Sequence, residues 1–175
     1  MGVGGGFVST KAVIEGGTHD GNVTAAGPAF SFDLAIGGAI KPGLILAGAY
    51  SVYAVGDAKL TNDTRRAPVA HDTQLTLLSA MIDLYPNPKE GFHFGGGLGV
   101  ATVRLRAAEN AGDDLGIQTG VGITPHVGYE WWVGNYWGMG ILGRFVYARS
   151  RGSYSGGTET DNHVGAAVLF SATYN

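Results

Sequence analysis

The sequence predicts an all-β protein, an eight-stranded antiparallel up-and-down transmembrane β-barrel. Three features support this fold class: apolar residues alternate with small or polar ones, glycine makes up 31 of 175 residues, and tight connections alternate with long ones. Alternation with a period of two is typical of strands with two unlike faces. Each glycine inside a helix costs up to about 1 kcal/mol relative to alanine, which disfavours helices here. We therefore expect one barrel domain over residues 1–175.

Composition excludes several other classes of protein. The hydrophobic share of 45% is too high for a disordered chain, and the net charge of −3 offers no basic surface for nucleic acid. No segment approaches the ~18 to 20 continuous apolar residues of a membrane helix. The absence of cysteine leaves the redox compartment open. The first residues, MGVGGGFVST, are not a signal peptide, so we expect that any export signal has been removed.

Eight runs with strand character follow one another along the chain. In the second run, Phe30, Phe32 and Leu34 share one face, and Ser31 and Asp33 share the other. The sixth run repeats this pattern, with bulky residues from Ile117 to Trp131 on one face and mostly small or polar ones on the other. The eight runs lie near residues 2–14, 24–40, 44–57, 73–85, 92–106, 116–133, 137–149 and 162–174.

The connections between these runs differ in length. The tight ones are 41–43, 86–91 and 134–136, and the long polar ones are 15–22, 58–72, 107–115 and 151–161. Because tight and long connections alternate strictly, a meander places every tight turn at one rim and every long loop at the other. We expect deletion of residues from GGTETD, in the last long loop, to leave the barrel folded.

The two faces of the strands decide between two kinds of barrel. A soluble lipocalin-type barrel encloses large apolar residues and presents charges to water. Here the bulky face carries almost no charge, and an eight-stranded interior is just wide enough for side chains. The small and polar face must therefore be inside, and the bulky face must contact lipid. The residues predicted to face lipid include Leu34, Ile36, Val121, Ile123, Ile141 and Phe170.

Three segments resemble a known group of proteins: DLYPNPKEGFHFGGGLG (83–99), VGYEWWVGNYWGMG (127–140) and NHVGAAVLFSATYN (162–175). They are similar to the small eight-stranded outer-membrane barrels of Gram-negative bacteria, the OmpA-, OmpX- and OmpW-like group. The resemblance covers essentially the whole chain. It implies a place in the outer membrane, three short periplasmic turns and four longer extracellular loops. It also implies contact with membrane lipid and lipopolysaccharide, and insertion by the barrel-assembly machinery. We expect a monomer.

Aromatic residues gather near the tight turns, as in an interfacial girdle. All three tryptophans surround the turn at 134–136. The alternative is the general preference of strands for aromatic residues. The predicted girdle consists of Tyr85, Phe92, Phe94, Trp131, Trp132, Trp137 and Tyr174.

Arginines gather in or beside the long loops, and the tight turns have none. Lipopolysaccharide fills the outer leaflet with phosphates, which guanidinium groups bind in a bidentate manner. The alternative is a solvated loop surface on which the arginines pair with neighbouring carboxylates, and the sequence leaves both open. The candidate lipid A contacts are Arg65, Arg66, Arg104, Arg106, Arg149 and Arg151.

Charged residues on inward positions predict a polar network inside the barrel, because a buried charge persists only when paired. The predicted network comprises Asp33, Asp83, His93, His126, Glu130 and Arg144. A three-residue turn at 134–136 pairs Val133 with Trp137 and so places His126 opposite Arg144. We expect an ion pair between Arg144 and Asp33, with Glu130 as the other available acceptor.

The sequence predicts no catalytic, metal or cofactor site. Some outer-membrane barrels modify lipid A with a histidine, a serine and an acidic residue. His126 has no serine beside it on its face, and Ser153 and Ser155 near the loop histidines form a nonspecific set. The five histidines show no H-x-x-x-H or similar spacing. We therefore expect neither enzyme activity nor a metal or cofactor.

Three functions stay open at this point. The preferred one is a structural or surface-interaction barrel whose lumen is largely plugged by small and polar side chains. The second is a narrow pore or small-molecule transport, since many inward glycines, such as Gly122, Gly128 and Gly165, leave volume inside. The third is modification of lipid A.

Overall fold

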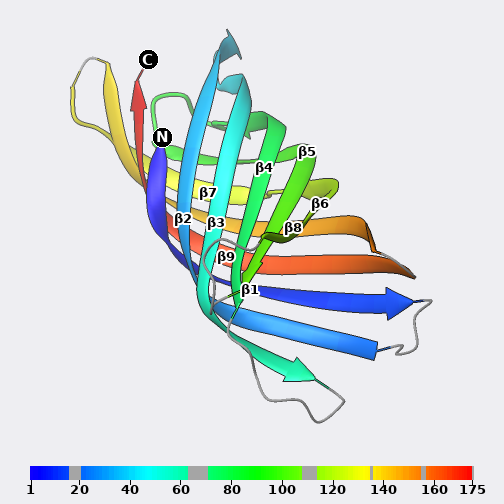
Figure 1. Cartoon of the computed structure of the whole chain (residues 1–175). Helices are drawn as coiled ribbons and strands as arrows, with labels where there is room; N and C mark the ends of the chain where they lie inside the picture. Colours follow the sequence, from blue (N-terminus) through cyan, green and yellow to red (C-terminus); the bar gives the residue numbers. More distant parts are fainter. Residues whose placement is uncertain (16–20, 63–70, 108–113, 135, 155–156, 175) are drawn as a thin grey trace.

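The computed structural model is an antiparallel barrel (Figure 1). It describes residues 1–15, 21–62, 71–107, 114–134, 136–154 and 157–174. Among these residues there is no helix long and apolar enough to cross a bilayer. The predicted all-β class is confirmed. The strands are β1 (Gly2–Glu15), β2 (Gly21–Lys41), β3 (Leu44–Asn62), β4 (His71–Leu84), β5 (Phe92–Ala107), β6 (Asp114–Ile123), β7 (His126–Trp132), β8 (Trp137–Tyr154) and β9 (Gly157–Tyr174).

The first and last strands close the barrel. β1 pairs with β2 on one side and with β9 on the other, while β4 pairs with β5. The two chain ends are tied together, because the Ala172 amide donates to the Met1 carbonyl over 2.8 Å. Both ends lie at one end of the barrel (Figure 1). Through the middle of the wall each strand is paired on both sides, which is what hydrocarbon requires of a spanning sheet.

The tight turns lie at the same end of the barrel as the termini, here called the short-turn end. Pro42 and Gly43 join β2 to β3, and Gly43 has a φ of 78°, which side chains other than glycine rarely adopt. The Gly43 carbonyl accepts a hydrogen bond from the Tyr85 amide, which ties two neighbouring turns together. The opposite end is called the long-loop end.

The sixth predicted run is divided into β6 and β7 at Thr124 and Pro125. Pro125 has no amide hydrogen, so the backbone ladder is interrupted there. The neighbouring strands still bond across the gap: Thr124 exchanges two hydrogen bonds with Gly97, and the Pro125 carbonyl accepts from the Phe145 amide. The nine strands therefore make eight passes along the barrel wall, as predicted.

The strands extend beyond their predicted ends at the long-loop end. β8 continues to Tyr154 and β9 begins at Gly157, so residues 157–161 pair with β8 and β1. Asp161, which lies opposite Ser150, is buried. The expectation that GGTETD is a dispensable loop is therefore wrong. Deleting it removes strand pairing and an interior residue. We placed the strand boundaries by the alternation of apolar residues. The paired residues 157–161 are polar and lack this alternation, so it could not reveal their strand.

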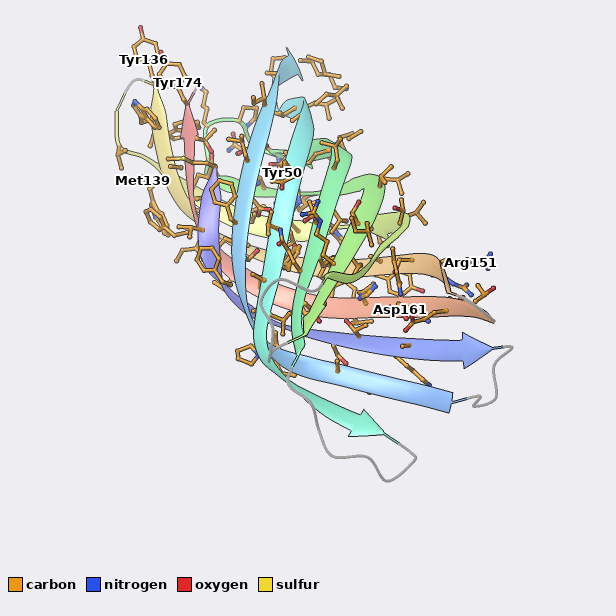
Figure 2. All side chains as sticks on the ribbon, in the orientation of Figure 1. Tyr50, Tyr136, Met139, Arg151, Asp161 and Tyr174 are labelled. Carbon is orange, nitrogen blue, oxygen red and sulfur yellow. The ribbon has the colours of Figure 1, made fainter. Side chains whose placement is uncertain are left out.

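The outer face of the barrel is apolar, as predicted. Large hydrophobic side chains stand exposed along every strand, and the six residues predicted to face lipid are among them. Figure 2 shows side chains projecting outward around the wall, with Tyr50 at mid-height and Tyr136 and Tyr174 at the short-turn end. Such a belt would aggregate in water but suits hydrocarbon.

The middle of the lumen is filled by large apolar side chains, here called the apolar plug. Its members are fully or almost fully buried and come from β1, β3, β4, β5, β8 and β9. The prediction of small and polar filling is wrong for this part of the barrel. The plug consists of Val8, Tyr53, Leu75, Leu77, Val103, Leu142, Val146 and Leu169.

Inward glycines make room for the plug. A Cβ atom at Gly122 would lie 2.6 Å from Leu77 Cδ2, and one at Gly165 would lie 2.8 Å from a methyl carbon of Val8. Both distances are shorter than a van der Waals contact. The volume that these glycines leave is therefore occupied by side chains from other strands, and it does not form a channel there.

Candidate functional site

All six residues of the predicted lumenal network are buried, and they line a cavity on the short-turn side of most of the apolar plug. Leu142, which precedes Arg144 on β8, lines the same cavity. Along β4 the inward positions run from Asp83 to Leu77 and Leu75, and along β8 they run from Arg144 to Val146. We call Asp33, Asp83, His93, His126, Glu130 and Arg144 the lumenal polar cluster. The register places His126 opposite Arg144, and the Val133 amide bonds to the Trp137 carbonyl.

Arg144 reaches across the lumen from β8 to β2 and β3. Its Nη1 lies 2.5 Å from Asp33 Oδ2 and donates to Ser51 Oγ over 3.1 Å. Asp33 and Ser51 face each other across the β2–β3 pair, so they form one acceptor surface. Both charged groups are more than nine-tenths buried, where an ion pair is screened little by water. Ser51 had no distinguishing signal in the sequence beyond its inward position.

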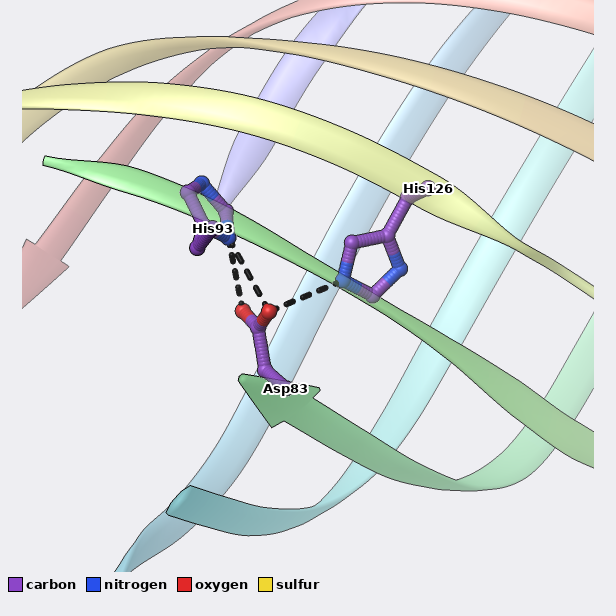
Figure 3. A group of neighbouring side chains, drawn as sticks. All are labelled: Asp83, His93 and His126. Carbon is purple, nitrogen blue, oxygen red and sulfur yellow. Dashed lines mark hydrogen bonds and ion pairs between the residues drawn. The ribbon is translucent and has the colours of Figure 1, made fainter. Parts of the chain in front are cut away.

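Asp83 lies between two imidazole rings (Figure 3). His93 Nδ1 is 2.9 Å from Asp83 Oδ2, and His126 Nε2 is 3.4 Å from Asp83 Oδ1. Gly95 explains this meeting, because it pairs with Asp83 on β4 and with His126 on β7 and has no side chain to separate them. The three residues come from three strands, so no short sequence spacing could reveal the group.

Glu130 contacts neither Arg144 nor the histidines in the described hydrogen bonds. It accepts from the Tyr85 hydroxyl over 3.0 Å and from the Thr173 hydroxyl. Burial, followed by the neighbouring Glu130 carboxylate, raises the pKa of Tyr85 above its usual value, so the hydroxyl keeps its proton and donates. Glu130 therefore does not act as an acceptor for Arg144, which pairs with Asp33 and bonds Ser51 instead.

Tyr85 does not belong to the outward aromatic girdle. Its ring stacks on His93 with centroids 4.8 Å apart and an interplanar angle of 9°, and its hydroxyl points to Glu130 inside the rim. The reason is the period of two: Asp83 faces inward and Leu84 outward, so Tyr85 faces inward again. The other proposed girdle residues are exposed, and Trp137 packs edge-on against Tyr174.

A cavity of about 370 Å³ adjoins the lumenal polar cluster. All six cluster residues line it, together with Tyr85 and inward positions of β2 such as Ala35 and Gly37. Ala35 and Gly37 are exposed although they follow the inward parity of Asp33. The lumen is therefore open to solvent at the short-turn end. The volume of this cavity is within the range of small-molecule sites.

Three of the candidate lipid A contacts, Arg104, Arg149 and Arg151, are exposed on the outer face. They lie on either side of β6 along one stretch of the wall, where β6 pairs Ile117 with Arg104, Thr119 with Arg151 and Val121 with Arg149. Figure 2 places Arg151 toward the long-loop end. We call these three residues the arginine patch. Arg65 and Arg66 lie outside the described residues, and only the backbone of Arg106 is described.

A second polar group occupies the lumen on the long-loop side of the plug. His163 Nδ1 is 2.9 Å from Thr10 Oγ1, and His163 Nε2 is 3.0 Å from Ser150 Oγ, which donates to Gln118. Among the serines near the histidines of the long loops, no signal in the sequence singled out Ser150 as the partner of His163. This serine and histidine are completely buried, so a substrate has no access to them as they stand.

No protein-family model and no curated protein matches the chain. Several solved structures do resemble the chain. The outer membrane protein OprG from Pseudomonas aeruginosa is 11% identical, with a TM-score of 0.58 over 99% of this chain and 93% of that one. Neisserial surface protein A is 15% identical, with a TM-score of 0.43 over 99% and 96%. The outer membrane protease OmpT from Escherichia coli is 10% identical, with a TM-score of 0.46 over 99% and 96%.

The likeness to OprG shows that the chain has the fold of small outer-membrane β-barrel proteins, as the sequence predicts. The belt of exposed apolar side chains fits the same location, because it requires hydrocarbon around the barrel. The chain therefore has the fold of outer-membrane β-barrels and an apolar outer belt suited to a bilayer. Its particular role is a separate question, since one fold carries many functions.

Proposed function

We propose that the protein is a non-conducting barrel of a Gram-negative outer membrane that acts through its outer surface. The observation that carries this proposal is the apolar plug. Leu75, Leu77, Val103 and Val146 are fully buried at mid-lumen. A continuous file of water or ions would have to replace close-packed side chains, and interiors at native density have few voids of that size.

Conductance in planar lipid bilayers tests the closed lumen. The wild-type barrel is expected to give no ion-conducting steps. Replacing Leu75 and Leu77 together by serine should produce steps, because the two removed side chains are central to the plug. The Leu78→Ser variant, altered at an exposed outward position, is the matched control. Steady conductance from the wild-type protein would refute the proposal.

We further infer that the arginine patch binds phosphate groups of lipopolysaccharide. The three guanidinium groups lie on the outer face near the long-loop end, which is the end exposed to the outer leaflet if the short turns are periplasmic. Arginine is suited to this ligand because its planar fork bonds phosphate oxygens in pairs. Such contacts support a surface-interaction role and need no opening of the lumen.

Binding of lipid A to the detergent-solubilised barrel tests the patch. Changing Arg149 or Arg151 to glutamine should weaken binding about fivefold each, since a cation near an anionic membrane surface contributes about 1 kcal/mol. Lys89→Gln, which alters an exposed cation at the short-turn end, should leave binding unchanged. Equal losses for all three variants would show a general charge effect and remove the patch from the proposal.

We also propose that the barrel is a monomer inserted by the barrel-assembly machinery. Closure of β1 onto β9 supports a self-contained unit, because all strands find partners within one chain. Light scattering of the protein in detergent should give the mass of one chain. A stable dimer would contradict this part of the proposal.

Small-molecule transport is the second candidate function. The cavity of about 370 Å³ at the short-turn end favours it, since such a volume accommodates a small solute. Transport across the membrane would then need displacement of the plug. Solute uptake by proteoliposomes in the absence of ion conductance would favour this candidate over the non-conducting barrel. The buried Ser150 and His163 do not lead us to assign lipid A modification.

A further inference from the structure

The charges of the lumenal polar cluster do not balance. Its carboxylates are Asp33, Asp83 and Glu130, and its one guanidinium is Arg144. Arg144 is paired with Asp33, so Asp83 and Glu130 remain without a permanently charged cation inside the cluster. With neutral histidines the cluster carries a net charge of −2. A buried surplus of this kind is costly unless a cation compensates it.

Three ligand atoms of the kind that bind transition metals converge at Asp83. His93 Nδ1, His126 Nε2 and a carboxylate oxygen of Asp83 all lie within 4.8 Å of one another. Donor atoms around one zinc ion, each about 2.0 to 2.2 Å from it, lie within about 4 Å of each other. A small rotation of the imidazole rings therefore brings the three atoms to ligand distances. Among the described residues this is the only such group of three.

The rings are held in place by neighbouring residues. Tyr85 stacks on the His93 ring, and its hydroxyl is fixed by Glu130. On the other side a Cβ atom at Gly128 would lie 2.3 Å from His93 Nε2, so the glycine makes room for the imidazole. His126 Nε2 likewise lies against Gly95, where a Cβ would be 3.0 Å away. These contacts restrict how the rings can turn, while the remaining ring nitrogens, His93 Nε2 and His126 Nδ1, are buried without a hydrogen-bond partner among the described residues.

The group also has access to solvent. Asp83, His93 and His126 all line the cavity that opens at the short-turn end. An ion could therefore enter from that side and keep one coordination position for water, as in zinc sites with three protein ligands. Each imidazole would bind in its neutral form, with its remaining proton on the ring nitrogen away from Asp83.

We propose that Asp83, His93 and His126 form a binding site for a divalent transition-metal ion such as Zn²⁺ inside the short-turn mouth of the barrel. Two imidazoles and one carboxylate form a donor set that suits Zn²⁺ and its first-row neighbours better than Ca²⁺ or Mg²⁺. The ion would supply the two positive charges that the cluster lacks. This site is independent of the arginine patch and of the closed lumen.

Titration of the tag-free protein in detergent tests the site. Zn²⁺ is followed by calorimetry, and Co²⁺ by its visible absorption, in a parent in which His19 and His71 are replaced by alanine. We expect one ion per chain. Asp83→Asn and His126→Gln should each weaken binding about tenfold or more. His163→Gln, which changes a buried histidine on the other side of the plug, should bind like the parent.

A measurement on the parent protein alone tests the site even if the variants fail to fold. Bound Co²⁺ should broaden the amide resonances of Gly95 and Gly128 and spare that of Gly165, which pairs with Val8 and Val146 deeper in the barrel. Broadening centred elsewhere, binding that survives Asp83→Asn, or no binding at all would overturn the proposal.

Discussion

The two halves of the lumen are built from the same alternating strands but have opposite character. Toward the short-turn end the inward positions carry Asp33, Asp83 and Arg144 around a cavity that solvent can enter. At mid-height they carry residues such as Leu75 and Leu77, which are completely buried. Strand alternation decides which side chains point inward. It does not decide whether the inside is wet, which depends on how the inward side chains of facing strands fit together.

The largest expected effect comes from breaking the ion pair of the polar half. Arg144→Met leaves Asp33 as a buried charge without its partner and should lower the free energy of unfolding by about 3 to 5 kcal/mol. Urea unfolding from lipid vesicles, followed by tryptophan fluorescence, measures it. Adding Asp33→Asn should recover part of the loss. If the double variant is no more stable than Arg144→Met, Asp33 is not the partner that matters.

A pair of adjacent leucines compares the plug with the lipid-facing surface. Leu77 is fully buried in the lumen, whereas Leu78 is 66% exposed on the outer face. Leu77→Ala should cost about 2 to 5 kcal/mol, because it opens a cavity among packed side chains. Leu78→Ala should cost less than about 1 kcal/mol, the difference between leucine and alanine in contact with lipid. The same unfolding assay applies, and equal losses would mean that the plug is loosely packed.

The smallest expected effect concerns the mouth of the cavity. Tyr85→Phe removes the hydrogen bond to Glu130 but keeps the ring stacked on His93, so it should cost about 0.5 to 1.5 kcal/mol. Tyr50→Phe, on the exposed outer face, should leave stability nearly unchanged and serves as the control. A loss at Tyr85 no larger than that at Tyr50 would indicate that the rim hydrogen bond contributes little.

Much of the barrel could be predicted from the sequence, because lipid on one side and a narrow lumen on the other make alternation unusually regular. The facing of Leu34 and Val121 follows from it, and so does the meeting of Arg144 with His126 across a three-residue turn. The facing of β1 could not be decided, since Gly4, Gly5 and Gly6 carry no facing signal. The structure turns Val8 and Thr10 inward and Phe7 and Lys11 outward.

The plug and the Asp83 group could not be predicted for the same physical reason, which is contact between strands that are distant in the sequence. Leu77 lies over Gly122, and Asp83 meets His126 across Gly95, so neither arrangement has a local spacing. Tyr85 is different. Its inward position was available from the parity of Asp83, and the tendency of aromatic residues to gather at the rim led to the wrong side.

The accessibility of introduced cysteines tests the contrast between the two halves most directly. The chain has no cysteine of its own, so each label reports on the introduced residue alone. Ala35 lines the open cavity, and Ala101 is a fully buried inward residue among the plug. A charged, water-soluble thiol reagent should label Ala35→Cys quickly in the folded barrel and Ala101→Cys only after denaturation. Rapid labelling of both in the folded protein would mean that water fills the lumen to mid-height, and it would contradict the closed barrel.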